Sequence, residues 1–264
     1  MKSRFAGGLI LGLFFSASSW AGQSSEETSE HEELLITIGV YDYAGMGTAS
    51  LAAAKRATSR ILRNAGVSIA WMTCPDPDTA PWDAGCANLV GPLKIALHIL
   101  PESKGARLLP RREVFGLAAE GTDGQFGCDL WVFYERITDP TLQVAISLSL
   151  PQIVGAVIAH ELGHLLLGSH SHSSTGIMRA HWSRGDLAAA NLGGLGYSSS
   201  ECARIRNAVA ARQQASLAAT GSSNRLLSGA LLVPRAVSLI YVNVPDLQIL
   251  PLTLRASSLR MRFG

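Results

Sequence analysis

The chain carries little charge and few aromatic residues for its length of 264 residues. Charged residues make up 16% of the sequence, aromatic residues make up 6%, and the formal net charge at pH 7 is +2. A nucleic-acid-binding protein concentrates basic side chains on one surface or presents aromatic rings on which bases stack. Neither pattern is present, so nucleic acid is not an expected partner. The sequence also shows no internal repeat.

The sequence also lacks an apolar run long enough to cross a bilayer, which takes about 20 residues. The run Gly7–Phe15 is shorter, and this disfavours a transmembrane anchor. Lys2 and Arg4 precede the run, small and polar residues Ser16–Ser19 follow it, and Ser19 and Ala21 fit the small positions before a cleavage site, which is the pattern of a cleaved signal peptide. We therefore expect residues 1–21 to be removed. The mature protein is then exported, either periplasmic or extracellular, with no membrane span.

Cysteine is scarce, and no two cysteines have the close spacing that is typical of paired zinc ligands. The chain contains Cys74, Cys86, Cys128 and Cys202. In an exported protein an even number of cysteines predicts disulfides, and four cysteines allow three pairings. The short proline-containing loop between Cys74 and Cys86 favours a local disulfide. Cys128 and Cys202 would then form a long-range pair.

Polarity and hydrophobic periodicity divide the mature chain into three parts. Residues 22–33 are polar and acidic without an apolar period, which is typical of a flexible leader. Residues 34–219 alternate predicted strands and helices, as expected of a folded domain. Residues 220–264 form a C-terminal extension that mixes short apolar runs with proline and arginine. Added strands, docking on the domain and mobility are all compatible with this last pattern.

Within the folded domain, the predicted order is strand, helix, several strands, a buried helix and a C-terminal helix. Segments Ser103–Gly124 and Ser173–Ser200 are predicted to be mainly loop. The order implies an α+β domain with a mixed twisted sheet, whose first two strands run parallel through a right-handed crossover. Predicted strands are Leu34–Tyr43, Val67–Met72, Leu93–Leu100 and Asp129–Ile137, and predicted helices are Thr48–Ala65, Pro151–Leu167 and a last helix after Ser198.

The chemistry is concentrated in the segment HELGH, which runs from His160 to His164 inside an apolar predicted helix. Residues four apart lie on one face of a helix, so the two imidazoles can hold one metal ion between them. Glu161 follows the first histidine and can reach a water molecule on that metal. Buried histidine and glutamate are costly unless they are paired or metal-bound. The alternative is a pair of hydrogen-bonded core histidines beside a solvated glutamate.

The longer segment HELGHLLLGSHSHSSTGIM resembles the metzincin clan of zinc peptidases, whose signature is HExxHxxGxxH followed by a turn that contains methionine. The HELGH sequence is most similar to that of the matrixins. The resemblance covers about residues 151–182 and the preceding strand order. It implies a metzincin-like single domain over residues 34–219 with a buried active-site helix. It also implies that His160 and His164 are zinc ligands, Glu161 is the general base and Met178 is the turn methionine.

The sequence departs from the clan pattern at the third ligand. Leu167 stands where the clan has glycine, and Gly168 comes one residue late. His170 has the clan spacing from the second ligand, whereas counting from Gly168 leads to Ser171. His172 and His170 are therefore both candidates for the third ligand. We favour His172, because a longer helix needs a longer return path to the metal.

These features together predict an exported zinc metalloendopeptidase that cleaves peptides or proteins with metal-activated water and a glutamate base. The resemblance implies that substrate lies as an added strand along a sheet edge, which strand order places at Asp129–Ile137. Only residues 22–33 precede the first strand, so no N-terminal pro-domain is expected.

Two other functions compete with the peptidase. One is a catalytically inactive, zinc-stabilised domain that binds a peptide or another partner; such a closed site would use both His170 and His172, and would not need Glu161. The other is a metal hydrolase that acts on a non-peptide amide. Nothing in the sequence distinguishes that substrate from a peptide.

Overall fold

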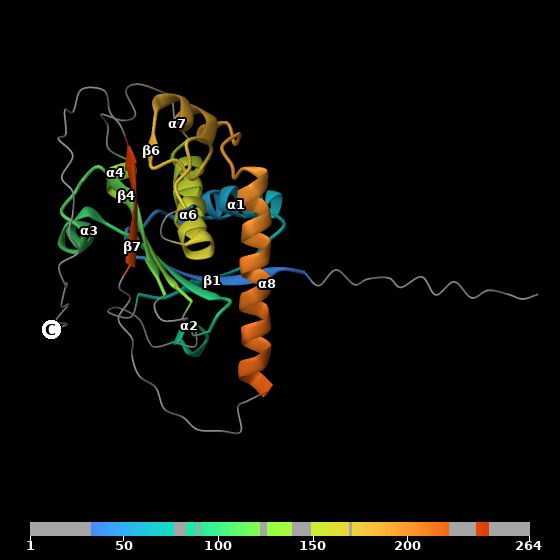
Figure 1. Ribbon diagram of the computed structural model, residues 1–264. Coiled ribbons are helices and arrows are strands. Elements are labelled where there is room, and N and C mark those ends of the chain that lie inside the picture. The colour runs from blue at the N-terminus through green and yellow to red at the C-terminus, as the bar shows by residue number, and fades with distance from the viewer. Residues whose placement is uncertain are drawn as a thin grey trace, which may run out of the picture. The chain divides into compact units, whose positions relative to one another are not determined.

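Strands from the whole described part of the chain assemble into one mixed sheet in the computed structural model (Figure 1). The structure describes residues 33–76, 83–87, 89, 91–121, 126–138, 149–168, 171–221 and 236–242. Its elements are β1 (Leu35–Asp42), α1 (Thr48–Asn64), β2 (Ser68–Cys74), α2 (Ala84–Ala87), β3 (Lys94–Leu100), α3 (Glu102–Leu108), β4 (Val114–Glu120), β5 (Asp129–Phe133), α4 (Tyr134–Ile137), α6 (Leu150–Leu167), β6 (His181–Trp182), α7 (Arg184–Asn191), α8 (Ser199–Gly221) and β7 (Ala236–Val242).

The strand order in the sheet is β2-β1-β3-β5-β4-β7-β6. The first four of these strands are mutually parallel, β4 is antiparallel to both β5 and β7, and β6 is parallel to β7. The predicted parallel pairing of the first two strands is confirmed, with Leu35 opposite Ser68 and Tyr41 opposite Cys74. The α+β class with a mixed sheet, a buried helix and a C-terminal helix is likewise confirmed.

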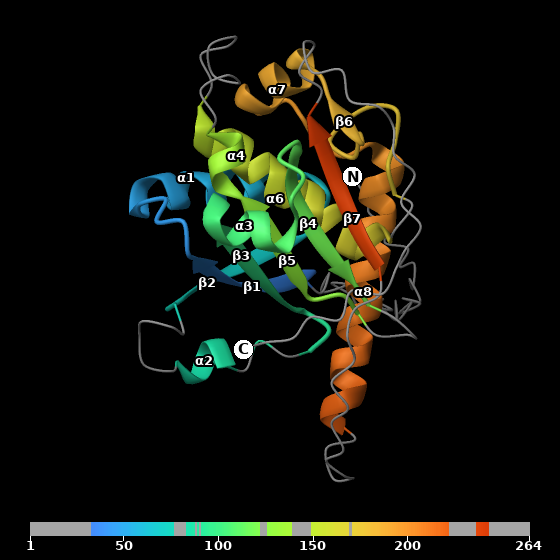
Figure 2. The same ribbon diagram turned by 90° about the vertical axis from the view of Figure 1, so that its left-hand side faces the viewer.

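The buried helix is α6, which lies with α1 and α8 on one side of the sheet, while α3 lies on the other (Figures 1 and 2). Every residue from Ile153 to Leu166 is buried. Gly155 allows close approach to α1, because a Cβ there would come 2.5 Å from the Cβ of Ala57. The expectation that no segment is long and apolar enough to cross a membrane is wrong by length and composition, because α6 alone among the described helices meets both criteria; 78% of it is buried in this fold. It is therefore a core helix.

The segment Ser103–Gly124 contradicts the prediction of a loop, since it contains α3 and β4. Strand β4 has the sequence VFGLAAE, and glycine and alanine are poor strand formers. Packing against α6 explains the small residues. A Cβ on Gly116 would lie 2.5 Å from Oε1 of Glu161, so the strand leaves room for that carboxylate. The glycine in this strand thus reflects a close contact with α6.

The segment Asp129–Ile137 also differs from the prediction. The strand ends at Phe133 and is followed by the short helix α4. More importantly, β5 lies between β3 and β4 rather than at an edge, so the predicted substrate-binding edge is wrong. The cause is β4, which follows α3 and pairs with β5 in the antiparallel direction. The sequence prediction does not include β4, and it therefore places the edge of the sheet at β5.

The predicted loop Ser173–Ser200 contains β6 and α7 as well. Helix α7 begins with a capping box, in which Ser183 and Asp186 each bind the other's backbone amide. Further along, α8 extends to Gly221, and β7 lies within the predicted C-terminal extension. The predicted signal peptide 1–21 and the leader up to residue 32 lie outside the described residues.

A buried arginine joins α8 to the rest of the domain. The Arg212 guanidinium donates to the carbonyls of Pro92 at 3.0 Å, Gly127 at 3.1 Å and Leu165 at 2.6 Å. It also stacks over Phe126, and the residue is only 2% exposed. Burial lowers its pKa to about 10, so the side chain stays charged at neutral pH. One cation therefore holds the segments before β3 and β5 and the end of α6 together.

The disulfide prediction is half correct. Cys74 and Cys86 form the predicted local disulfide, but Cys128 and Cys202 are free thiols rather than a pair. Cys128 adjoins Gly127, which binds Arg212, and Arg212 lies ten residues beyond Cys202 on α8. At about 1.5 Å of rise per residue this is about 15 Å along the helix. A disulfide needs Cα atoms within about 7 Å of each other, and this spacing disfavours the pair that the sequence predicts.

Candidate metal centre

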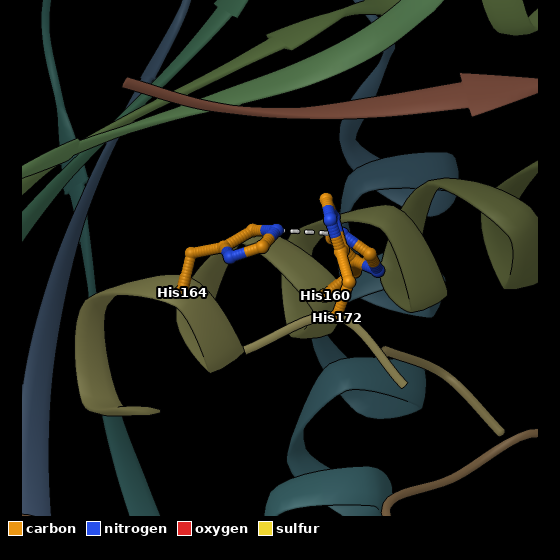
Figure 3. Close-up of side chains that lie close together, drawn as sticks. All are labelled: His160, His164 and His172. Carbon is orange, nitrogen blue, oxygen red and sulfur yellow. Dashed lines mark hydrogen bonds between the residues drawn. The ribbon is translucent and has the colours of Figure 1, made fainter. Parts of the chain in front are cut away.

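The two histidines of the HELGH segment face each other across one turn of α6 (Figure 3). Both are completely buried, and the Nε2 atoms of His160 and His164 are 2.9 Å apart. Two nitrogens that each lie about 2.0–2.1 Å from a tetrahedral zinc ion are about 3.3–3.4 Å apart. The helix therefore places the two ring nitrogens close to the separation that a shared metal ion requires.

A third imidazole comes from the loop that follows α6. Gly168 ends the helix with φ of 90°, a conformation that favours glycine, and the chain then returns to bring His172 beside the pair. Ring nitrogens of His160, His164 and His172 all lie within 4.8 Å of one another. His172 is exposed, unlike the other two. The competing candidate His170 lies outside the described residues.

Hydrogen bonds at the rear of each ring set its orientation. Nδ1 of His160 lies 2.6 Å from the carbonyl oxygen of Ile177, which also accepts a hydrogen bond from the indole of Trp182. A carbonyl can only accept, so Nδ1 carries the hydrogen and Nε2 keeps its lone pair. Nδ1 of His164 lies 2.9 Å from the hydroxyl of Ser171. Such contacts orient metal-binding imidazoles and fix which nitrogen is available.

Electrostatics keep both buried imidazoles neutral. Burial, followed by the nearby His164, holds the pKa of His160 well below its ordinary value. Burial and the charge of His172 lower the pKa of His164 to about 3. Protons therefore do not compete for these nitrogens at neutral pH, and their lone pairs remain available to a metal ion.

Glu161 is the most unusual group in the site. It is completely buried, and neither carboxylate oxygen has a hydrogen-bond partner among the described residues. Burial alone raises its pKa well above the ordinary value. A buried carboxyl group without partners is costly, and in native proteins it calls for a ligand, an ion or water. Three imidazoles with this carboxyl group therefore fit a zinc ion with a water molecule.

Met178 packs against α6, the helix that carries His160 and His164. It is completely buried, and its sulfur packs against Gly163, the residue before His164. A side chain at Gly163 would collide with that sulfur. The glycine in HELGH is thus explained by packing, and the methionine supports the helix at the second ligand.

Sequence reasoning missed three residues that shape the site: Ser171, Trp182 and Gly116. Ser171 stands at the position that one count from Gly168 assigns to a ligand, and it contacts the second ligand instead. Gly116 carries no local signal, because it reaches the site only through the packing of β4 against α6. Trp182 lies five residues after Ile177, but the shared contact with His160 at the Ile177 carbonyl depends on how α6 packs against this segment.

Comparison with known proteins identifies no relative from which the function of the site can be transferred. No protein-family model matches the chain, and no curated protein matches it. A match among solved structures is the crystal structure of archaemetzincin from Methanopyrus kandleri, with a TM-score of 0.35 and 15% sequence identity. That match covers 69% of this chain and 96% of the other. Similarity at this level assigns no function to the chain.

Proposed function

We propose that this protein is an exported, zinc-dependent metalloendopeptidase that hydrolyses peptide bonds in peptide or protein substrates. One observation carries the proposal: a completely buried glutamate without a partner stands next to a histidine ligand in a three-histidine cluster. A structural metal site has no need for such a carboxyl group, whereas hydrolysis needs a base at this position. The likeness of HELGH to the matrixins remains a prediction within this proposal.

In this mechanism the three histidines hold the metal and Glu161 moves the proton. A zinc ion lowers the pKa of water toward neutrality and polarises a carbonyl group. Glu161 accepts the proton of the attacking water and then delivers it to the leaving amine, so that the C–N bond breaks as the amine forms. Burial raises the pKa of Glu161 above its ordinary value, and a carboxyl group with a raised pKa holds a proton more readily between the two steps.

Three histidine ligands favour catalysis over a closed structural site. Structural zinc uses four protein ligands, and catalytic zinc leaves the fourth position to water or substrate. A closed site here would need a further ligand such as His170, which lies outside the described residues. Hydrolysis of a non-peptide amide would use the same groups. A screen of peptide and non-peptide amide substrates distinguishes the two activities.

The disulfide supports export. The Cys74–Cys86 disulfide persists in oxidising compartments, which include the periplasm and the extracellular space. The predicted signal peptide over residues 1–21 would deliver the chain there, and amino-terminal sequencing of the mature protein tests it.

The first experiment compares His172→Ala with His170→Ala in the mature chain. We expect His172→Ala to weaken zinc affinity about 100-fold and to abolish cleavage of an unfolded protein at limiting zinc, because one of three ligands is lost. His170→Ala should change neither quantity. Competition titration with a zinc chelator and a cleavage assay provide the measurements. The reverse result would make His170 the ligand, and a parent protein that holds zinc without cleaving any protein would contradict the peptidase.

Ser171→Ala should weaken zinc affinity about tenfold, since partners of zinc-bound imidazoles typically contribute 10–100-fold. The hydroxyl holds the ring of His164, so its loss frees the ring to rotate. Ser171→Thr keeps the hydroxyl and should restore the affinity. Substitution with cobalt gives an absorption spectrum that reports ligand geometry, and the Ala variant should change it. An unchanged spectrum and affinity in Ser171→Ala would show that the hydroxyl does not orient the ligand.

A further inference from the structure

Strand β7, from the C-terminal region of the chain, lies between β4 and β6 (Figure 2). It pairs with β4 in the antiparallel direction, from Val114 opposite Tyr241 to Glu120 opposite Ala236. Strand β6 pairs with β7 and has no described pairing with β4. Without β7, the continuous part of the sheet would end at β4.

Strand β4 is also the part of the sheet that lies against the catalytic carboxyl group. Gly116 of β4 leaves the space that the Glu161 side chain fills. The ladder between β4 and β7 is irregular at this point, between the pairs Val114–Tyr241 and Leu117–Leu239. The backbone around Ile240 of β7 is therefore opposite Gly116.

Strand β7 also contacts α6, the helix that carries the first two histidines. In Figure 3 the strand in the colour of β7 runs past the three labelled histidines. One extended segment therefore follows the open edge of β4 and passes beside the candidate metal centre.

An extended peptide binds to a sheet edge through the unpaired N–H and C=O groups of the edge strand. Those groups of β4 are the ones that a peptide substrate would use to lie beside Glu161. In the structure, the chain's own residues 236–242 use them. A substrate strand and β7 cannot pair with the same side of β4 at the same time.

We propose that β7 is an intramolecular inhibitory strand, which occupies the substrate-binding edge of β4 and leaves it when substrate binds. The inference rests on the proposed peptidase function. It places the control of activity in the C-terminal extension of the chain, and it identifies β4 as the edge that accepts the substrate strand.

The test uses the full mature chain with proline introduced into β7. Ser238→Pro and Leu239→Pro are made separately, because successive residues of a strand alternate in whether their N–H groups pair with a given neighbour. Proline removes an N–H group and disrupts strand pairing. Ser257→Pro, outside β7, is the matched control. If β7 is paired in about nine of ten molecules, its release raises the initial rate of peptide cleavage about tenfold. Equal rates in parent and both β7 variants would overturn the proposal.

A second measurement separates this inference from the peptidase proposal. A fluorescently labelled synthetic peptide with the sequence of residues 234–244 should bind the β7 variants and compete with substrate, whereas the parent should bind it about tenfold more weakly. Anisotropy measures this binding without any catalysis. If the variants bind the peptide more strongly but neither they nor the parent cleave substrate, the peptidase proposal is overturned. The proposal that β7 occupies the edge of β4 is then retained. Equal binding to parent and variants would overturn the inhibitory strand.

Misfolding of a proline variant is controlled by cutting the folded chain. A site for a specific protease, inserted between Gly221 and Ala236, allows β7 to be separated after folding. Cleavage there should raise peptidase activity after dilution, and added peptide 234–244 should reverse the increase. Activity that stays constant after the cut would contradict the proposal regardless of how the proline variants fold.

Discussion

Replacing Glu161 with Gln lowers kcat for peptide cleavage by about 10²–10⁴-fold, the range that a positioned general base contributes. Gln has nearly the same shape, so the packing against Gly116 is kept. It cannot accept the proton of the attacking water, whereas the proposed ligands His160, His164 and His172 are unchanged. Zinc content should therefore equal that of the parent. Steady-state kinetics and metal analysis of the purified proteins measure both quantities.

Glu201→Gln is the matched control for this change. Glu201 is also buried, at 4% exposure, but its carboxylate accepts a hydrogen bond from the backbone amide of Ser198 at the start of α8. This variant should keep its activity. Full activity in Glu161→Gln would exclude that residue as the base. A parent and a variant that both hold zinc and both fail to cleave would favour the alternative of a zinc-stabilised binding domain.

Replacing Arg212 with Met lowers the free energy of unfolding by about 3–5 kcal/mol. Methionine fills much of the volume but donates no hydrogen bond, so three carbonyls lose a charged donor at about 1–2 kcal/mol each. In a domain of this size the loss corresponds to a fall in Tm of about 10 °C. Because Leu165 follows His164 directly, the change should also weaken zinc binding.

Arg204→Met provides the comparison. Arg204 lies on the same helix and donates to a single carbonyl, that of Leu167, from an exposed position. Its loss should cost less than about 0.5 kcal/mol, as is usual at surface sites. Thermal unfolding followed by circular dichroism compares the three proteins. Similar midpoints for Arg212→Met and the parent would show that α8 is held by its apolar contacts alone.

The parts of the fold that can be predicted from sequence are those with strong local patterns. Helix α6 combines a continuous apolar run with Pro151 at its start and Gly168 at its end, so its bounds follow closely. Alternation or apolar runs likewise locate β1 and β3. The HELGH spacing places two imidazoles on one face of α6 by helix geometry alone, which requires no tertiary information.

The parts that cannot be predicted depend on contacts between distant segments. Strand β4 has small residues because Glu161 packs against Gly116, a contact that leaves no local strand pattern. Without β4, the substrate edge falls one strand too early. The path of the loop after Gly168 decides between His170 and His172, and residue counting alone does not fix that path. Cys128 lies just before β5 and Cys202 lies on α8, and nothing in the sequence around either cysteine shows that both thiols stay free.

The candidate metal site joins two parts of the molecule that differ in burial. His160 and His164 belong to the buried core helix, so their geometry lasts as long as the domain is folded. His172 completes the cluster as an exposed side chain on the loop after α6. We expect a bound ion to leave first at His172, because exposed groups separate at a lower free energy than the buried core. Exchange of the metal with its surroundings is therefore a local property of the loop, and its rate can change without any change in the stability of the fold.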